Sequence, residues 1–207
     1  MSKFFHYLSK ILRHKCLVWK YCRWAGLYWQ GLTHDWSKFS CVEFREGLKY
    51  YHLTDSEFEI AKLKQHDLSY GWLHHRGRNP HHYEYWRDNL DDVRFIRKRH
   101  AMPYRYVVEM LADIYAHRHA LYQPDYLLID RVVDYWETKR KTAKAMHPAT
   151  SEFVTWFIQE AQTRKQECAS ARQESDNVVL KTLFQECRTD AMQQRYADMI
   201  TATENHR

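Results

Sequence analysis

Turn-forming residues are scarce in this chain, and that scarcity restricts its fold more than any other feature. The 207 residues include only 5 Gly and 4 Pro, fewer together than the 14 His. A β-sandwich or barrel needs a turn signal every few residues, so an all-β fold is close to excluded. Hydrophobic residues make up 44% of the chain, which is enough to build a sizeable core. The sequence therefore predicts an all-α protein.

Apolar spacing and helix-start signals divide the chain into predicted helices. Apolar residues recur at intervals of three and four over residues 3–25, and a short helix is expected over 27–35. Capping boxes begin at Ser40 and Thr54, and prolines suit the first turn of later helices. These signals predict helices over 40–51, 54–76, 80–99, 103–121 and 124–145.

The segment His147-Pro148-Ala149-Thr150 interrupts the helical pattern. We expect it to end a first helical domain over residues 1–150, which carries the candidate site. Residues 151–207 are then a C-terminal extension with helices over 151–169 and 177–202. Their polar composition predicts a helical hairpin that lies apart from the site or joins copies of the chain into a homo-oligomer.

Charge and cysteine usage restrict the partners and the compartment. The net charge is +6, and no acid precedes Asp35. A positive field favours an anionic small-molecule substrate. The basic, aromatic first helix also suits nucleic acid or a lipid surface, but an ordinary solvated basic face is the favoured interpretation. No apolar run reaches the roughly 20 residues of a membrane span, and the 5 Cys include no Cys-x-x-Cys pair, so we expect a cytoplasmic protein.

Histidine and aspartate positions carry the chemical signal. His14 falls on the apolar stripe of the first helix, and His34 is followed directly by Asp35. Five more histidines fall between positions 66 and 82, and Asp113 lies in a later helix. Imidazole nitrogens with carboxylate oxygens bind Zn, Mn, Fe, Co or Ni, whereas Mg and Ca prefer mostly oxygen. Each residue alone has an ordinary structural interpretation, but together they indicate a site for one or two divalent transition-metal ions.

The order His14, His34-Asp35, Asp113 resembles the H…HD…D pattern of the HD-domain superfamily of metal-dependent phosphohydrolases. The segment from Gly31 to Lys38, GLTHDWSK, looks like the hallmark segment of that superfamily. This resemblance implies an all-helical HD-like bundle in which His14, His34, Asp35 and Asp113 ligate the metal. It also implies hydrolysis of a phosphate ester, with nucleotides as the first substrate class to consider.

A closer similarity is to the DUF5662 type of uncharacterised phage and bacterial proteins. It covers roughly residues 5–150 and rests on five short runs: Leu12–Lys15, His34–Phe39, Trp72–His75, Arg78–His82 and Glu109–Asp113. The segment Met146–Thr150 also fits. A phage origin would place the protein in the cytoplasm of a bacterial host.

The histidine-rich corner between residues 74 and 82 has more than one interpretation. Neighbours on a helix point about 100° apart, so His74 and His75 cannot both face one ion. His75 shares the more apolar stripe, and we expect it to face inward as a further metal ligand. A helix beginning at Asn79-Pro80 would present free N–H groups to the substrate's phosphate. The residues expected to bind that phosphate are Arg76, Arg78, His81 and His82. A histidine-rich surface turn without a role is the remaining interpretation.

The sequence thus predicts a divalent-metal-dependent phosphohydrolase that acts on an anionic small molecule, a nucleotide by resemblance. Asp35, Lys38 and Glu109 are the expected catalytic residues. Lys38 would offset charge on the phosphoryl oxygens, and Glu109 would orient a ligand histidine. Two alternatives stay open: an HD-type mixed-valence di-iron oxygenase with the same ligands, and a basic nucleic-acid or membrane-surface binding protein with a degenerate metal site.

Overall fold

A computed structural model describes residues 3–50, 52, 69–87, 99–121, 127–170 and 176–205. Every regular element in these residues is a helix, and extended residues pair there only in one isolated bridge between Arg87 and Arg99. The predicted all-α fold is confirmed. Among the described helices, none combines the length and the apolar character that a membrane span requires.

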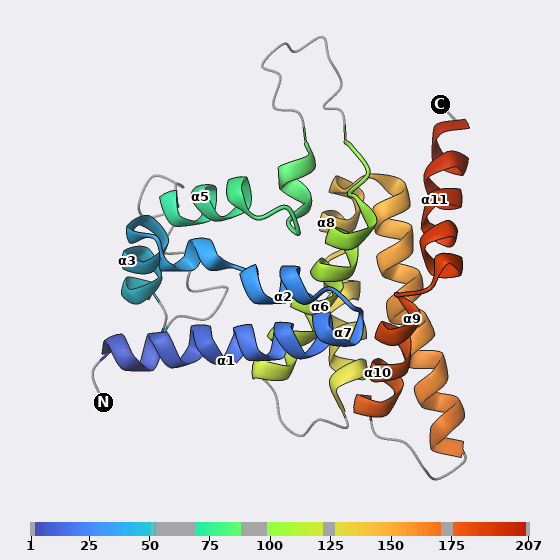
Figure 1. Cartoon of the computed structure of the whole chain (residues 1–207), viewed down its shortest axis with the longest axis horizontal. Helices are drawn as coiled ribbons and strands as arrows, with labels where there is room; N and C mark the ends of the chain where they lie inside the picture. Colours follow the sequence, from blue (N-terminus) through green and yellow to red (C-terminus); the bar gives the residue numbers. More distant parts are fainter. Residues whose placement is uncertain are drawn as a thin grey trace.

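The helices fall into two groups in space (Figure 1). In chain order the elements are α1 (Lys3–Trp24), α2 (Tyr28–Thr33), the 3-10 turn η1 (Trp36–Phe39), α3 (Cys41–Tyr50), α5 (Tyr70–Arg78), the 3-10 turn η2 (Tyr83–Trp86), α6 (Tyr104–Leu121), α7 (Leu128–Thr138), α8 (Arg140–Ala145), α9 (Pro148–Ser170), α10 (Asp176–Glu186) and α11 (Asp190–Asn205). Helix α1 runs along one edge with α2 and α3 beside it, and α5 packs on α3 on the side away from α1. Helices α9 and α11 run crosswise to α1.

One hydrophobic cluster connects the early helices with the last three. The ring of Phe184 on α10 lies 5.3 Å from that of Tyr21 on α1 and 5.9 Å from that of Tyr115 on α6. Phe157 on α9 lies 5.1 Å from Phe184, and all four rings are fully buried. Residues on both sides of position 150 therefore build the core that supports α1 and α6. The predicted division into 1–150 and 151–207 stays a prediction, which a truncation described below tests.

The predicted helix over 54–76 is confirmed at residues 70–76, but it is wrong as one continuous helix, because the backbone breaks at Ser69. Residues 53–68 lie outside the described residues, but Ser69 is extended and is the N-cap of α5. Its hydroxyl accepts a hydrogen bond from the backbone N–H of Trp72 at 2.9 Å, which satisfies one of the free donors at the helix start. Helix α5 then continues past the expected end at Gly77 to Arg78.

The helix predicted to start at Asn79-Pro80 is also wrong. Asn79 instead ends α5: its side-chain amide donates to the carbonyl of His75 at 2.8 Å and to Ser37 Oγ at 2.7 Å. Residues 81 and 82 form a turn before η2, and residues 88–98 lie outside the described part of the chain. His81 and His82 therefore do not occupy the first turn of a long helix.

Two other predicted helices are each interrupted by a short break. The helix over 124–145 is divided into α7 and α8 at Lys139, and residues 122–126 are outside the described residues. The helix over 177–202 is divided into α10 and α11, where the hydroxyl of Thr189 accepts from the N–H of Met192 at 3.3 Å. The predictions for residues 3–25 and 103–121 are confirmed to within a few residues.

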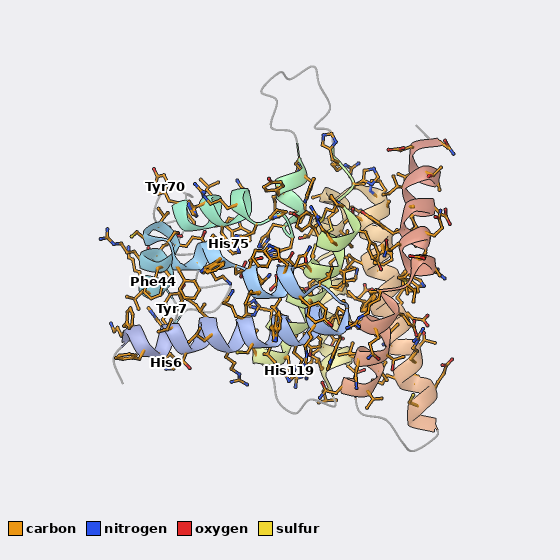
Figure 2. The ribbon with its side chains drawn as sticks, in the orientation of Figure 1. His6, Tyr7, Phe44, Tyr70, His75 and His119 are labelled. Atoms are coloured by element: carbon orange, nitrogen blue, oxygen red, sulfur yellow. The ribbon has the colours of Figure 1, made fainter. Side chains whose placement is uncertain are left out.

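A glycine permits the contact between α1 and α3. Tyr7 and Phe44, both labelled in Figure 2, pack between these helices with ring centroids 5.2 Å apart. A Cβ added at Gly47 would overlap Tyr7 Oη and lie 2.5 Å from Tyr7 Cζ, whereas a Cβ at Gly77 would meet nothing within 4 Å.

We expect Gly47→Ala to lower the free energy of unfolding by about 1–3 kcal/mol, because Tyr7 must leave its packing position. Gly77→Ala is the matched control, and it should raise stability by up to about 1 kcal/mol, since alanine favours a helix over glycine. Thermal unfolding of the two variants measures both effects. Equal shifts for the two variants would contradict the close contact of α1 and α3.

Candidate metal centre

A sharp backbone turn after α2 directs two neighbouring side chains into the protein. Asp35 adopts φ 53° and ψ 29°, the left-handed region, which Asp tolerates better than most residues. As a result His34 and Asp35, although adjacent in sequence, are both buried, at 1% and 2% exposure. The turn places the carboxylate of Asp35 between α1, α5 and α6, and Figure 2 shows His75 on the side of α5 that faces α2.

The first group of candidate ligands comes from α1, α2 and α6. His14 Nε2 lies 3.0 Å from Asp113 Oδ1, and His34 Nε2 lies 3.6 Å from the same oxygen. Asp35 Oδ2 lies 3.9 Å from His14 Nε2 and 3.4 Å from His34 Nε2. The ligand atoms of His14, His34 and Asp113 all lie within 4.8 Å of one another, which suits one bound ion.

The second group surrounds the other oxygen of Asp35. Asp35 Oδ1 lies 3.3 Å from His75 Nε2 and 3.4 Å from His81 Nε2. Together with His82, these residues offer four ligand atoms within 4.8 Å of one another. Asp35 therefore has one oxygen beside each group, the arrangement needed for a carboxylate that bridges two ions.

Several nitrogen and oxygen atoms in this cluster have no hydrogen-bond partner among the described residues. They are buried and they belong to the two ligand groups: His14 Nε2 and His34 Nε2 in the first, and His81 Nε2, His82 Nε2 and Asp35 Oδ1 in the second. Buried polar atoms without a partner are rare in folded proteins, because losing water without replacement costs about 1–3 kcal/mol each. Their gathering within each group, and their nitrogen-rich chemistry, fit a transition-metal ion. These groups can hold a metal ion.

Two buried glutamates hold the opposite edges of the imidazoles. Glu109 Oε1 lies 3.0 Å from His34 Nδ1 and 3.1 Å from His81 Nδ1. Glu43 Oε2 lies 2.8 Å from His75 Nδ1, while its Oε1 lies 2.6 Å from His74 Nδ1. A carboxylate on Nδ1 fixes the tautomer that leaves Nε2 free to bind a metal.

Glu43 is the residue of this cluster that sequence analysis missed. Its position three residues after Ser40 indicates only a helix-capping role. The backbone N–H of Glu43 does donate to Ser40 Oγ at 3.3 Å, but its carboxylate turns to α5, 31 and 32 residues later in the chain. No local spacing relates Glu43 to His75, so no signal in one sequence could have assigned it.

We expect Glu43→Gln to weaken metal binding by about 10–100-fold while the protein stays helical, since His75 loses the carboxylate that orients it. Competition with a chelator of known affinity measures the change. Glu160→Gln, which alters a partly exposed ion pair with Arg164 on α9, is the matched control and should bind metal like the wild type. Equal affinity in the two variants would remove Glu43 from the centre.

Mutual charges keep the centre ionised despite burial. Burial alone would raise the pKa of Asp35, but His34, Lys38 and His75 hold that pKa well below its ordinary value. Lys38 Nζ lies 2.6 Å from Asp35 Oδ2, and although burial opposes its charge, Asp35 raises the pKa of the Lys38 ammonium. Burial, followed by the charges of His81 and His75, lowers the pKa of His82 well below its usual range, which keeps that imidazole neutral. Burial opposes a charge on His34, but Asp35, Asp113 and Glu109 raise the pKa of that imidazole well above its usual range, so a metal ion that binds His34 must displace its proton.

The predicted site residues divide into those that the structure brings together and those that it does not. The predicted metal ligands all meet in this cluster: His14, His34, Asp35, His75 and Asp113. His81 and His82, predicted to bind phosphate, lie in the same cluster instead of at a helix start. Arg76 and Arg78 lie in the last turn of α5, and only Arg78, which is exposed, reaches a pocket beside the cluster. The roles assigned to these residues stay predictions, and His66 lies outside the described residues.

Comparison with known proteins assigns the chain at the level of a family. No curated protein and no solved structure matches it. The sequence model of the DUF5662 family, a family of unknown function, matches residues 3–160. That range holds every residue of the candidate metal centre together with the helices that carry them. The chain therefore belongs to the DUF5662 family.

Proposed function

We propose that this chain is a divalent-metal-dependent phosphohydrolase with a two-ion centre bridged by Asp35. The observation that carries the proposal is the environment of the Asp35 carboxylate. A separate group of imidazole Nε2 atoms faces each of its oxygens, and most of those nitrogens have no hydrogen-bond partner among the described residues. When bound, such ions would lower the pKa of a water molecule and polarise a phosphoryl oxygen.

Membership of the HD-domain superfamily is part of this proposal. It is supported by the spatial convergence of His14, His34, Asp35 and Asp113 from α1, the end of α2 and α6. The imidazole-rich set favours Mn, Fe, Co, Ni or Zn over Mg or Ca. Nucleotides are the first substrates to test, because of the same resemblance.

Lys38 and Asp113 mark the side from which a substrate reaches the centre. Their side chains keep 30% and 25% of their surface exposed, whereas those of Asp35 and His34 are at most 2% exposed. The Lys38 ammonium lies beside Asp35, where it would offset negative charge on the phosphoryl oxygens. Glu109 and Glu43 would hold the imidazoles in place without touching the substrate.

The experiment combines metal analysis with an activity screen on protein purified without a histidine tag. Aryl phosphates and nucleotides are offered to the protein as purified, after chelation, and after reloading with each candidate ion. We expect hydrolysis that chelation abolishes and one or more ions restore. Metal-loaded protein that hydrolyses nothing in the panel would refute the proposal, and an oxygen-dependent product from an iron-loaded protein would replace it with the di-iron oxygenase.

Lys38→Met separates hydrolysis from metal binding. We expect the rate to fall by about 10²–10³-fold, because an aligned positive charge is lost, while the metal content stays unchanged. A variant that keeps full activity would remove Lys38 from the reaction. Lys49→Met, an exposed substitution on α3, is the control and should leave both quantities unchanged.

A further inference from the structure

A pocket of about 500 Å³ lies beside the metal centre, on the side of Glu109. From the cluster it is lined by His34, His81 and Glu109, and by neither Asp35 nor Asp113. Glu109 contacts the Nδ1 edges of His34 and His81, whereas their Nε2 edges face Asp35. The pocket therefore lies on the Nδ1 side of these imidazoles and is separate from the volume between the candidate metal ligands.

The rest of the pocket combines aromatic rings with positive charge. Trp29 on α2 and Trp36 on η1 line it, although they are 70% and 61% exposed. Arg105 lies over the ring of Tyr106, with its guanidinium carbon 4.8 Å from the ring centroid. Arg78 comes from the end of α5. Two arginines and three aromatic side chains thus surround one opening.

Charge in this pocket is not balanced by its own lining. Glu109 is the one acid that lines it, and that carboxylate contacts two histidines. Within the described part of the chain, Arg78 makes no hydrogen bond or ion pair, and Arg105 contacts only the neighbouring Tyr106 through its guanidinium group. Guanidinium groups bind carboxylates and phosphates through paired N–H donors, so both arginines are free to take an anion.

We propose that this pocket binds a planar aromatic anion. Its charged group would lie against Arg78 and Arg105, and its ring would stack on Trp29 or Trp36, since stacking on an aromatic side chain contributes about 1–3 kcal/mol. The volume is that of a small-molecule site, which favours such a ligand over a lipid bilayer or a nucleic-acid duplex. The proposal does not rest on hydrolase activity, because the pocket lies outside the candidate metal ligands' shared volume.

The test measures binding of 2-naphthylphosphonate to the whole chain, as purified, by isothermal titration calorimetry. This probe has a planar ring and a dianion, and its C–P bond resists hydrolysis. We expect 2-naphthol, which lacks the anion, and methylphosphonate, which lacks the ring, to bind at least about tenfold more weakly. A probe that binds no more tightly than methylphosphonate would overturn the aromatic part of the proposal.

Variants locate the bound probe. Arg78→Ala, Arg105→Ala and Trp36→Ala should each weaken it by about tenfold, and all three side chains lie at the protein surface, where truncation spares the fold. Arg45→Ala, an exposed arginine on α3 outside the pocket lining, is the matched control and should bind normally. Lys38→Met tests the competing location. If Lys38→Met weakens probe binding and Arg105→Ala does not, the anion lies at the metal centre and the proposal is overturned.

Discussion

Asp35→Asn should empty the metal centre of a chain that remains folded. The substitution removes the charge and one oxygen of the carboxylate that lies between the two ligand groups. Asparagine is the right replacement, because it tolerates the left-handed backbone of position 35 and keeps the size of the side chain. We expect the metal content per chain to fall at least about tenfold, since no remaining residue faces both groups.

Metal analysis by mass spectrometry measures the loss, and circular dichroism checks the helices. Asp198→Asn on the exposed side of α11, where the carboxylate accepts a hydrogen bond from Gln194, is the matched control. It should keep the wild-type metal content. A folded Asp35→Asn variant with unchanged metal would show that the carboxylate bridges nothing.

Truncation after Thr150 should leave a chain that does not fold cooperatively. It removes the buried side chains of Phe153, Phe157, Leu183 and Phe184, which belong to the same cluster as Tyr21 of α1. Losing each of these four groups costs about 2–5 kcal/mol, so together they cost about 8–20 kcal/mol, which is as large as the whole stability of a typical domain, roughly 5–15 kcal/mol. We expect a truncated chain without a cooperative thermal transition and without the metal that the whole chain binds.

A point substitution gives the same test within the whole chain. Phe184→Ala should lower the free energy of unfolding by about 3–5 kcal/mol, because its ring fills the space between α1 and α6. Val178→Ala, 42% exposed on the same helix, should change it by less than about 1 kcal/mol. For the truncation, a chain of residues 1–150 that melts cooperatively and retains metal would instead confirm the predicted two-part division.

The fold class followed from the sequence because it depends on local features. Few glycines and prolines exclude frequent turns, and the stripe of apolar residues on α1 appears directly in the spacing of Ile11, His14 and Val18. The same stripe predicts that His14 faces inward. Adjacent His34 and Asp35, both buried here, are informative because ligands that neighbour each other in sequence need only one sharp turn to meet.

The remaining parts of the centre depend on tertiary contacts. Asn79 ends α5 because Ser37, 42 residues earlier, accepts from its side chain, and that contact overrides the helix-start signal of Asn79-Pro80. Because of the same turn, His81 and His82, which were predicted to bind phosphate at a helix start, lie in the ligand cluster. The role of Glu43 also appears only when α3 and α5 are side by side.

The position of bound metal tests the central claim most directly. Crystals of the metal-loaded wild-type chain, measured at the absorption edge of the metal found by analysis, give an anomalous difference map. We expect two peaks on opposite sides of the Asp35 carboxylate, one shared with His14, His34 and Asp113 and one with His75 and His81. A map of metal-loaded crystals with no peak beside Asp35 would contradict the account.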